Sequence, residues 1–169
     1  MKNFKLNLMY ILNIIFGVLI YVFLSQSYIA IGEGRFQQNI TGYDVIGNYF
    51  DGNSTEVMMA LSNLLVAILA GVIILISIYG LLASMGIVKS GKAVKIANFV
   101  NIVSSLILFA FAAIGLFCTL GETDSNVIVE NLSKVGWANI VNMIIGLLML
   151  VASILSYVFA KGTKKKKKK

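Results

Sequence analysis

Four long runs of apolar residues, each free of charged side chains, dominate the pattern of hydrophobic and polar positions along the chain. They cover residues 6–24, 57–88, 96–120 and 135–160. About 20 apolar residues of α-helix cross the hydrocarbon core of a bilayer, which is about 30 Å thick. A buried helix of a soluble protein rarely stays uncharged for so long, so each run predicts a membrane-spanning helix. Since the second run exceeds what a bilayer needs, we expect it to tilt or to project beyond the lipid.

The connections between these runs predict how the helices are arranged. Residues 89–95 form a short link, which makes the second and third helices antiparallel neighbours. Residues 121–134 form another short connection, in which Ile128, Leu132 and Val135 recur at helical spacing and favour a fourth helix that begins before the membrane.

The first connection, residues 25–56, is longer than most connections between elements, and such loops are usually functional or carry their own structure. Its aromatic residues Tyr43, Tyr49 and Phe50 argue against a disordered linker. Glycines punctuate it, and we therefore expect a small hairpin or compact cap. These three residues are the outer-loop recognition candidates, although a cap that only covers the helix ends is an equal alternative.

The predicted fold class is an all-α integral membrane protein: an antiparallel four-helix transmembrane bundle with a small extracellular cap, for which a β-hairpin is one form. Residues 1–163 form a single domain, and residues 164–169 form a poly-lysine cytoplasmic tail. Met1 to Ser27 also resembles a signal peptide, which remains an alternative. The apolar core of a cleaved signal is usually only about 7–15 residues long, so we favour a retained span.

Charge gives an orientation to this bundle. All seven acidic residues lie in the connections 25–56 and 121–134, whereas these hold only Arg35 and Lys134 of the fourteen basic residues. The positive-inside rule then places both termini in the cytoplasm and both acidic loops outside the cell membrane. Trp137 falls near an outer helix end, and Tyr10 and Tyr157 fall near inner ends, so we expect all three rings at the membrane interfaces.

The lysine tail suggests a partner on the cytoplasmic side. Clustered lysines next to a span attract anionic lipid headgroups, by about 1 kcal/mol per residue. A stop-transfer and orientation signal without a specific partner, or a cytoplasmic protein with an acidic surface, are the alternatives. We expect no nucleic-acid partner, because no aromatic or fold context accompanies the charge. The candidate lipid contacts are Lys164, Lys165, Lys166, Lys167, Lys168 and Lys169.

Asparagine occurs in every predicted span. In lipid such a side chain needs a hydrogen-bond partner, which a neighbouring helix supplies. The asparagines of the first and third spans lie in the cytoplasmic half, and those of the second and fourth lie in the outer half. We therefore predict two polar clusters that hold helices together, with a hydrophilic pathway or ligand pocket as the alternative. The helix-packing candidates are Asn13, Asn63, Asn98, Asn101, Asn139 and Asn142.

Small residues four positions apart also favour close helix packing. They indicate either a tight bundle or an oligomer face, and the sequence does not distinguish the two. The seams are Ala67 and Gly71, Gly80 and Ser84, Ala97 with Asn101 and Ser105, and Ala138 with Asn142 and Gly146.

The spans contain no ionisable residue other than tyrosine and Cys118, which argues against proton relays and ion-coupled transport. Histidine is absent and Cys118 is the one cysteine, so we expect no enzyme activity, no metal site and no cofactor. The segment from Asp51 to Glu56 offers alternating oxygen atoms, faintly like a calcium loop, but is far shorter than an EF-hand loop. Asn53 or Ser54 more simply caps the second span, with Glu56 in its first turn.

The layout of a long first outer loop, a short second one and two inner termini resembles that of claudin-type and other tetraspan proteins. The resemblance is one of architecture. The claudin first-loop signature of tryptophan, Gly-Leu-Trp and two cysteines is absent, and so is the cysteine-rich second loop of tetraspanins. No family assignment follows.

Three functions remain. The first is a structural, accessory or assembly role, alone as a homo-oligomer or with another membrane protein. The second is a channel or facilitator subunit for a small solute. The third is a surface-exposed binding protein that acts through the first outer loop.

Overall fold

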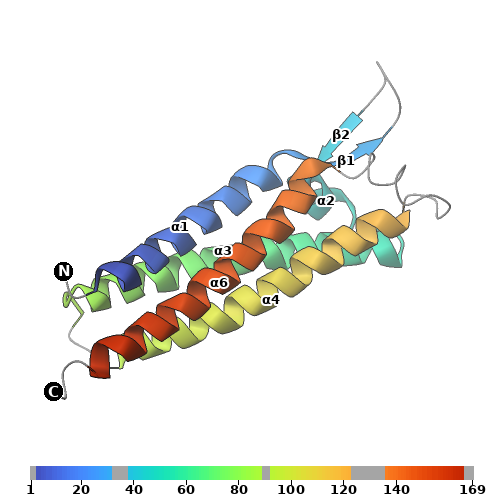
Figure 1. The fold of residues 1–169 in the computed structure, drawn as a ribbon. Coiled ribbons are helices and arrows are strands. Elements are labelled where there is room, and N and C mark those ends of the chain that lie inside the picture. The colour runs from blue at the N-terminus through green and yellow to red at the C-terminus, as the bar shows by residue number, and fades with distance from the viewer. Residues whose placement is uncertain (1–2, 32–37, 89–91, 123–135, 166–169) are drawn as a thin grey trace.

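Four long helices make up most of the computed structural model, which describes residues 3–31, 38–88, 92–122 and 136–165 (Figure 1). The helices have 21, 31, 30 and 29 residues. All four are long and apolar enough to cross a membrane. The four predicted helices are thus confirmed, whereas the predicted early start of the last one falls on residues outside the described part. The helices are α1 (Phe4–Leu24), α3 (Ser54–Ser84), α4 (Ala93–Glu122) and α6 (Trp137–Lys165).

The helices form an antiparallel bundle in which α1 and α4 each pack between α3 and α6. Every neighbouring pair runs in opposite directions, and the start of α1 and the end of α6 lie at the same end of the bundle (Figure 1). We call this the inner end, and we call the opposite end, which carries the two strands, the outer end.

The start of α3 shows why a helix begins at Ser54. The side-chain oxygen of Asn53 accepts hydrogen bonds from the backbone N–H groups of Thr55 and Glu56, both at 2.9 Å. In return, Glu56 Oε2 accepts from the N–H of Asn53 at 2.8 Å. This capping box satisfies groups that the first turn leaves without helical partners. The predicted cap by Asn53 is confirmed.

The same helix ends at Ser84, four residues before the apolar run does. Gly86 adopts a φ of 85°, in the left-handed region that glycine enters without a steric cost. The helix ends before Gly86 although Ile87 and Val88 continue the hydrophobic pattern. The predicted helix, which ended at residue 88, was therefore too long.

A small cap covers the outer end of the bundle (Figure 1). Strands β1 (Ser27–Ile31) and β2 (Gln38–Thr41) pair in antiparallel fashion, with Ile29 opposite Ile40 and an irregularity between Ser27 and Ile29. The short helix α2 (Gly42–Asn48) follows and packs against α3. The predicted hairpin is therefore present, joined by a helix that the sequence had not indicated.

A second capping box begins α2. Thr41 Oγ1 accepts from the N–H of Asp44 at 3.2 Å, and the Asp44 carboxylate accepts from the N–H and hydroxyl of Thr41 at 2.9 and 2.7 Å. These bonds hold the pKa of the exposed Asp44 carboxyl below its usual value. Val45 is buried beneath this turn, and Gly42 allows close approach to Leu24, since a Cβ there would lie 2.8 Å from that side chain.

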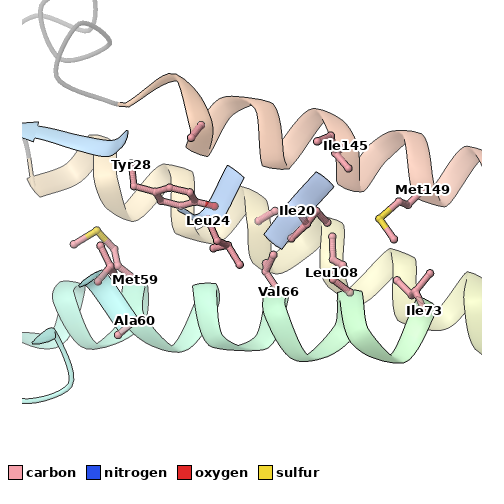
Figure 2. Close-up of a cluster of buried hydrophobic side chains, with 14 of the residues drawn as sticks. Ile20, Leu24, Tyr28, Met59, Ala60, Val66, Ile73, Leu108, Ile145 and Met149 are labelled. Atoms are coloured by element: carbon pink, nitrogen blue, oxygen red, sulfur yellow. The ribbon is translucent and has the colours of Figure 1, made fainter. Parts of the chain in front are cut away.

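Apolar side chains from all four long helices meet in the middle of the bundle (Figure 2). Close packing of this kind, rather than a hydrophobic drive, holds helices together when lipid surrounds them. This apolar core includes Ile20 and Leu24 of α1, Val66 and Ile73 of α3, Leu108 of α4, and Ile145 and Met149 of α6.

Candidate functional site: two buried polar layers and an outer cap

The polar residues of the long helices face the interior, and the exposed positions of their apolar stretches are hydrophobic. This is the partition expected of helices whose surroundings are lipid, because each polar group needs a partner that lipid lacks. The buried polar residues are Asn13, Ser62, Asn63, Ser77, Asn98, Asn101, Ser104, Ser105, Thr119, Asn139, Asn142, Ser153 and Ser156.

Asn98 lies at the centre of one hydrogen-bonded group. Its Oδ1 accepts from the hydroxyl of Tyr10 at 2.7 Å and from that of Ser156 at 2.9 Å. These two bonds connect α4 to α1 and to α6. The side chain of Tyr10 is fully buried, so the prediction that its ring lies at the interface was wrong. The bond to Asn98 makes burial of its hydroxyl tolerable.

A second set of bonds continues this group toward the middle of the bundle. Asn13 Nδ2 donates to Ser153 Oγ at 3.0 Å, and the hydroxyls of Ser153 and Ser105 lie 3.0 Å apart. Asn101 Nδ2 donates to Ser77 Oγ at 3.0 Å. All four long helices therefore contribute to one inner polar layer, which comprises Tyr10, Asn13, Ser77, Asn98, Asn101, Ser105, Ser153 and Ser156.

A separate group lies near the outer end. Asn139 Nδ2 donates to Thr119 Oγ1 at 2.9 Å, and Asn142 Nδ2 donates to the hydroxyl of Tyr28, which reaches into the bundle from β1. Burial raises the pKa of Tyr28 above its ordinary value. Asn63 of α3 is also buried, next to Gly115. The outer polar layer comprises Tyr28, Ser62, Asn63, Thr119, Asn139 and Asn142.

Apolar side chains of the core lie between the two layers, and Figure 2 shows Leu108, Ile145 and Met149 among them. Along α6, Ser153 of the inner layer lies eleven positions after Asn142 of the outer one, which amounts to about 16 Å of helix. Leu108, Ile145 and Met149 fill the space between them, and each is at most 5% exposed. The described residues thus place the polar groups in two clusters with a closed apolar segment between.

Four buried oxygen atoms of the two layers receive no hydrogen bond from the protein. They are Asn13 Oδ1 and Asn101 Oδ1 in the inner layer, and Asn142 Oδ1 and Ser62 Oγ in the outer one. A buried polar atom without a partner costs about 1–3 kcal/mol.

The seams of small residues lie against neighbouring helices of the same chain. A Cβ on Gly80 would lie 2.6 Å from the ring of Tyr10, and one on Gly71 would lie 2.8 Å from the hydroxyl of Tyr21. A Cβ on Gly146 would lie 3.0 Å from Leu108. These three glycines therefore allow close packing between helices of the same chain.

The three recognition candidates of the outer loop differ in exposure. Tyr43 and Phe50 are exposed, at 44% and 42%, whereas Tyr49 packs half-buried against the apolar core. The hydroxyl of Tyr43 donates to the carbonyl of Tyr21 at 3.3 Å, which ties α2 to the outer part of α1. An exposed aromatic pair thus remains on the cap.

The other predicted interface residues lie at the two ends of the bundle. Trp137 begins α6 and stacks edge-on against Phe23, with 5.3 Å between ring centroids. At the inner end, Lys161 Nζ lies 4.4 Å from the centre of the Tyr157 ring. The backbone of α6 continues through Lys164 and Lys165, while the rest of the lysine tail lies outside the described residues.

The hydroxyl partners of the asparagines are the residues that the sequence did not single out. Ser77, Ser153, Ser156 and Thr119 complete the layers, together with Tyr28 from the cap. Ser153 and Ser156 lie three residues apart on one helix face, which is the spacing that could have indicated them.

The described residues include no group of three or more His, Cys, Asp or Glu side chains that could hold a metal ion. Comparisons with protein families, with curated proteins and with solved structures gave no match to this chain.

Proposed function

We propose that this chain is a non-enzymatic multi-pass membrane protein with a structural, accessory or assembly role. The length of the four helices and the inward orientation of their polar residues support insertion in a bilayer. The charge pattern supports an orientation with the inner end in the cytoplasm: Lys5, Lys92, Lys95 and Lys161 are exposed near that end. The lysine tail next to them would meet anionic lipid headgroups.

The observation that carries the proposed role is the separation of the two polar layers by the apolar core. Hydrogen bonds between elements of one chain hold all of the predicted asparagines except Asn63, which supports a role in packing. A solute path would need polar groups that continue through the bundle, and Leu108, Ile145 and Met149 interrupt them. A packed scaffold with an apolar circumference suits lateral assembly with a second copy or with another membrane protein.

Flux measurements separate this proposal from the channel hypothesis. The purified chain is reconstituted in vesicles, and permeability to water, glycerol and urea is compared with that of empty vesicles. We expect no difference. A protein-dependent flux that Asn101→Leu abolishes would contradict the scaffold role.

Cross-linking tests the assembly role, because Cys118→Ser leaves a chain without cysteine. In that background, Leu75→Cys on the exposed face of α3 is compared with Ile73→Cys in its interior. Phe99→Cys and Phe117→Cys probe the exposed face of α4. We expect one face to give a discrete cross-linked species in native membranes. A chain that gives none, and that is monomeric in mild detergent, would contradict the proposal.

Recognition through the cap is a second candidate, favoured by the exposure of Tyr43 on α2 and of Phe50 in the turn that follows this helix. Phe50→Cys extends the same experiment to the outer end. Cross-links at this position, with none on the helix faces, would favour binding through the cap over lateral assembly.

A further inference from the structure

The inner polar layer contains two carbonyl oxygens that the protein leaves without a donor. Asn13 Oδ1 and Asn101 Oδ1 receive no hydrogen bond, and both residues are 0% exposed. Each amide uses its other end, since Asn13 Nδ2 donates to Ser153 and Asn101 Nδ2 donates to Ser77.

Exchanging the positions of Oδ1 and Nδ2 in either amide still leaves one of the two atoms without a hydrogen bond. The serine hydroxyl would then donate to the carbonyl oxygen, and the amide nitrogen would lose its acceptor instead. The neighbouring Asn98 differs, because its Oδ1 accepts two hydrogen bonds. The missing hydrogen bond is therefore specific to Asn13 and Asn101, whichever way their amides are oriented.

These two amides belong to one connected region. Ser153 links Asn13 on α1 to Ser105 on α4, and Ser105 lies one helical turn after Asn101 on the same face. Asn101 lies eight residues into α4, about 12 Å of helix from the inner end of that helix. The inner polar layer at Asn101 thus lies about two turns of helix from the inner end of the bundle.

We propose that the inner polar layer binds ordered water, which donates hydrogen bonds to the carbonyl oxygens of Asn13 and Asn101. Buried waters in proteins bond to polar groups that the chain itself does not satisfy, with about three hydrogen bonds each. The nearby hydroxyls of Ser77, Ser105 and Ser153 supply additional partners. Water would then complete the connection between α1, α3, α4 and α6 that the protein groups leave open.

The chemistry of the layer favours water over a metal cation. Its members are neutral amides and hydroxyls, with no carboxylate among them. A cation held here would lose its hydration without a compensating charge, which is costly in an apolar interior. A water molecule instead carries no charge and donates the hydrogen bonds that these carbonyl oxygens lack.

High-resolution crystallography of the full chain in a lipid mesophase tests this proposal. We expect density for water at about 2.8 Å from Asn13 Oδ1 or Asn101 Oδ1, in crystals grown with sodium and in crystals grown with choline instead. Asn98 Oδ1 is the internal control, because its two hydrogen bonds leave no place for such a water. Absence of density beside both amides would overturn the proposal. So would density that appears only with sodium and has shorter distances of about 2.4 Å to several oxygens, which would indicate a cation.

The variant Asn101→Leu provides a second measurement. It keeps the branched shape of the side chain and removes the whole amide group, so the water beside α4 should disappear while the helices keep their positions. Water that persists there unchanged would contradict the assignment to Asn101. If this variant does not fold, the wild-type density with its internal control still decides the question.

Discussion

The hydroxyl of Tyr10 donates a hydrogen bond of 2.7 Å to Asn98 Oδ1, across 88 positions of sequence. The bond connects α1 to α4, two helices that lie diagonally opposite each other in the bundle. It also fixes the ring of Tyr10 against Gly80 of α3. A single buried pair thereby holds three helices in register near the inner end.

Replacing this pair should lower the free energy of unfolding by unequal amounts. Tyr10→Phe removes one hydrogen bond but leaves Asn98 bonded to Ser156, so we expect a loss of about 1 kcal/mol. Asn98→Leu leaves the buried hydroxyl of Tyr10 without its acceptor, so we expect about 2–3 kcal/mol. Denaturation in mixed micelles measures both values.

Tyr157→Phe is the matched control, since that tyrosine is 41% exposed and the loss of its hydroxyl should change little. The double variant of Tyr10 and Asn98 should cost less than the sum of the single changes. Strict additivity would show that the two residues do not interact.

Hydropathy predicted the four helices, and the asparagine positions predicted two polar clusters. Both predictions rest on the same physical cause. Lipid around a span offers no hydrogen bonds, and this affects every residue of the helix. The burial of Tyr10 could not be predicted in this way, because a tyrosine near a helix end suits the interface and the interior equally. Only the position of Asn98 on another helix decides between them.

Local conformation explains the other differences. The hydrophobic pattern continues past Ser84, whereas the left-handed backbone of Gly86 ends α3. In the cap, Thr41 and Asp44 lie three residues apart and form a capping box that begins α2, whereas the sequence pattern predicts only a small hairpin or compact cap there. Such signals depend on one or two residues, and a pattern taken over twenty positions does not detect them.

Gly80→Ala should destabilise the bundle although alanine favours helix more than glycine does. The added Cβ would lie 2.6 Å from ring atoms of Tyr10 and 3.0 Å from the Cβ of Ala97. The hydrogen bond to Asn98 prevents the ring from moving away, so we expect a cost of about 1–3 kcal/mol in the same denaturation assay. Gly115→Ala is the control within another long helix, because its Cβ would meet its nearest neighbour, Ser62, at 3.4 Å, an ordinary contact. Equal effects of the two substitutions would contradict this packing.

Acid should loosen the cap at α2. Hydrogen bonds from Thr41 lower the pKa of Asp44 below its ordinary value of 3.8, so the folded cap favours the ionised carboxylate. A group with a lowered folded pKa stabilises the fold above its unfolded pKa, and this contribution is lost as the pH falls below about 4 toward the lowered value. Hydrogen exchange of the α2 amides, corrected for intrinsic rates, should therefore show less protection at pH 3 than at pH 6.

Asp44→Asn is the control for this effect. Asparagine keeps an oxygen that accepts from Thr41 but does not titrate, so the protection of α2 should no longer depend on pH in this range. A wild-type cap whose protection is the same at both values would show that the Asp44 carboxylate does not stabilise α2.

Trp137 should report the depth of the outer end in the bilayer, because it is the one tryptophan of the chain. Its ring is 52% exposed at the first residue of α6 and stacks on Phe23 near the end of α1. In reconstituted vesicles, lipids brominated near the headgroup should quench its fluorescence more strongly than lipids brominated near the chain ends. The variant Trp137→Phe with Leu75→Trp moves the probe to an exposed position within α3, where the order of quenching should reverse. If both probes gave the same depth, the bundle would not lie across the bilayer with its helices along the membrane normal.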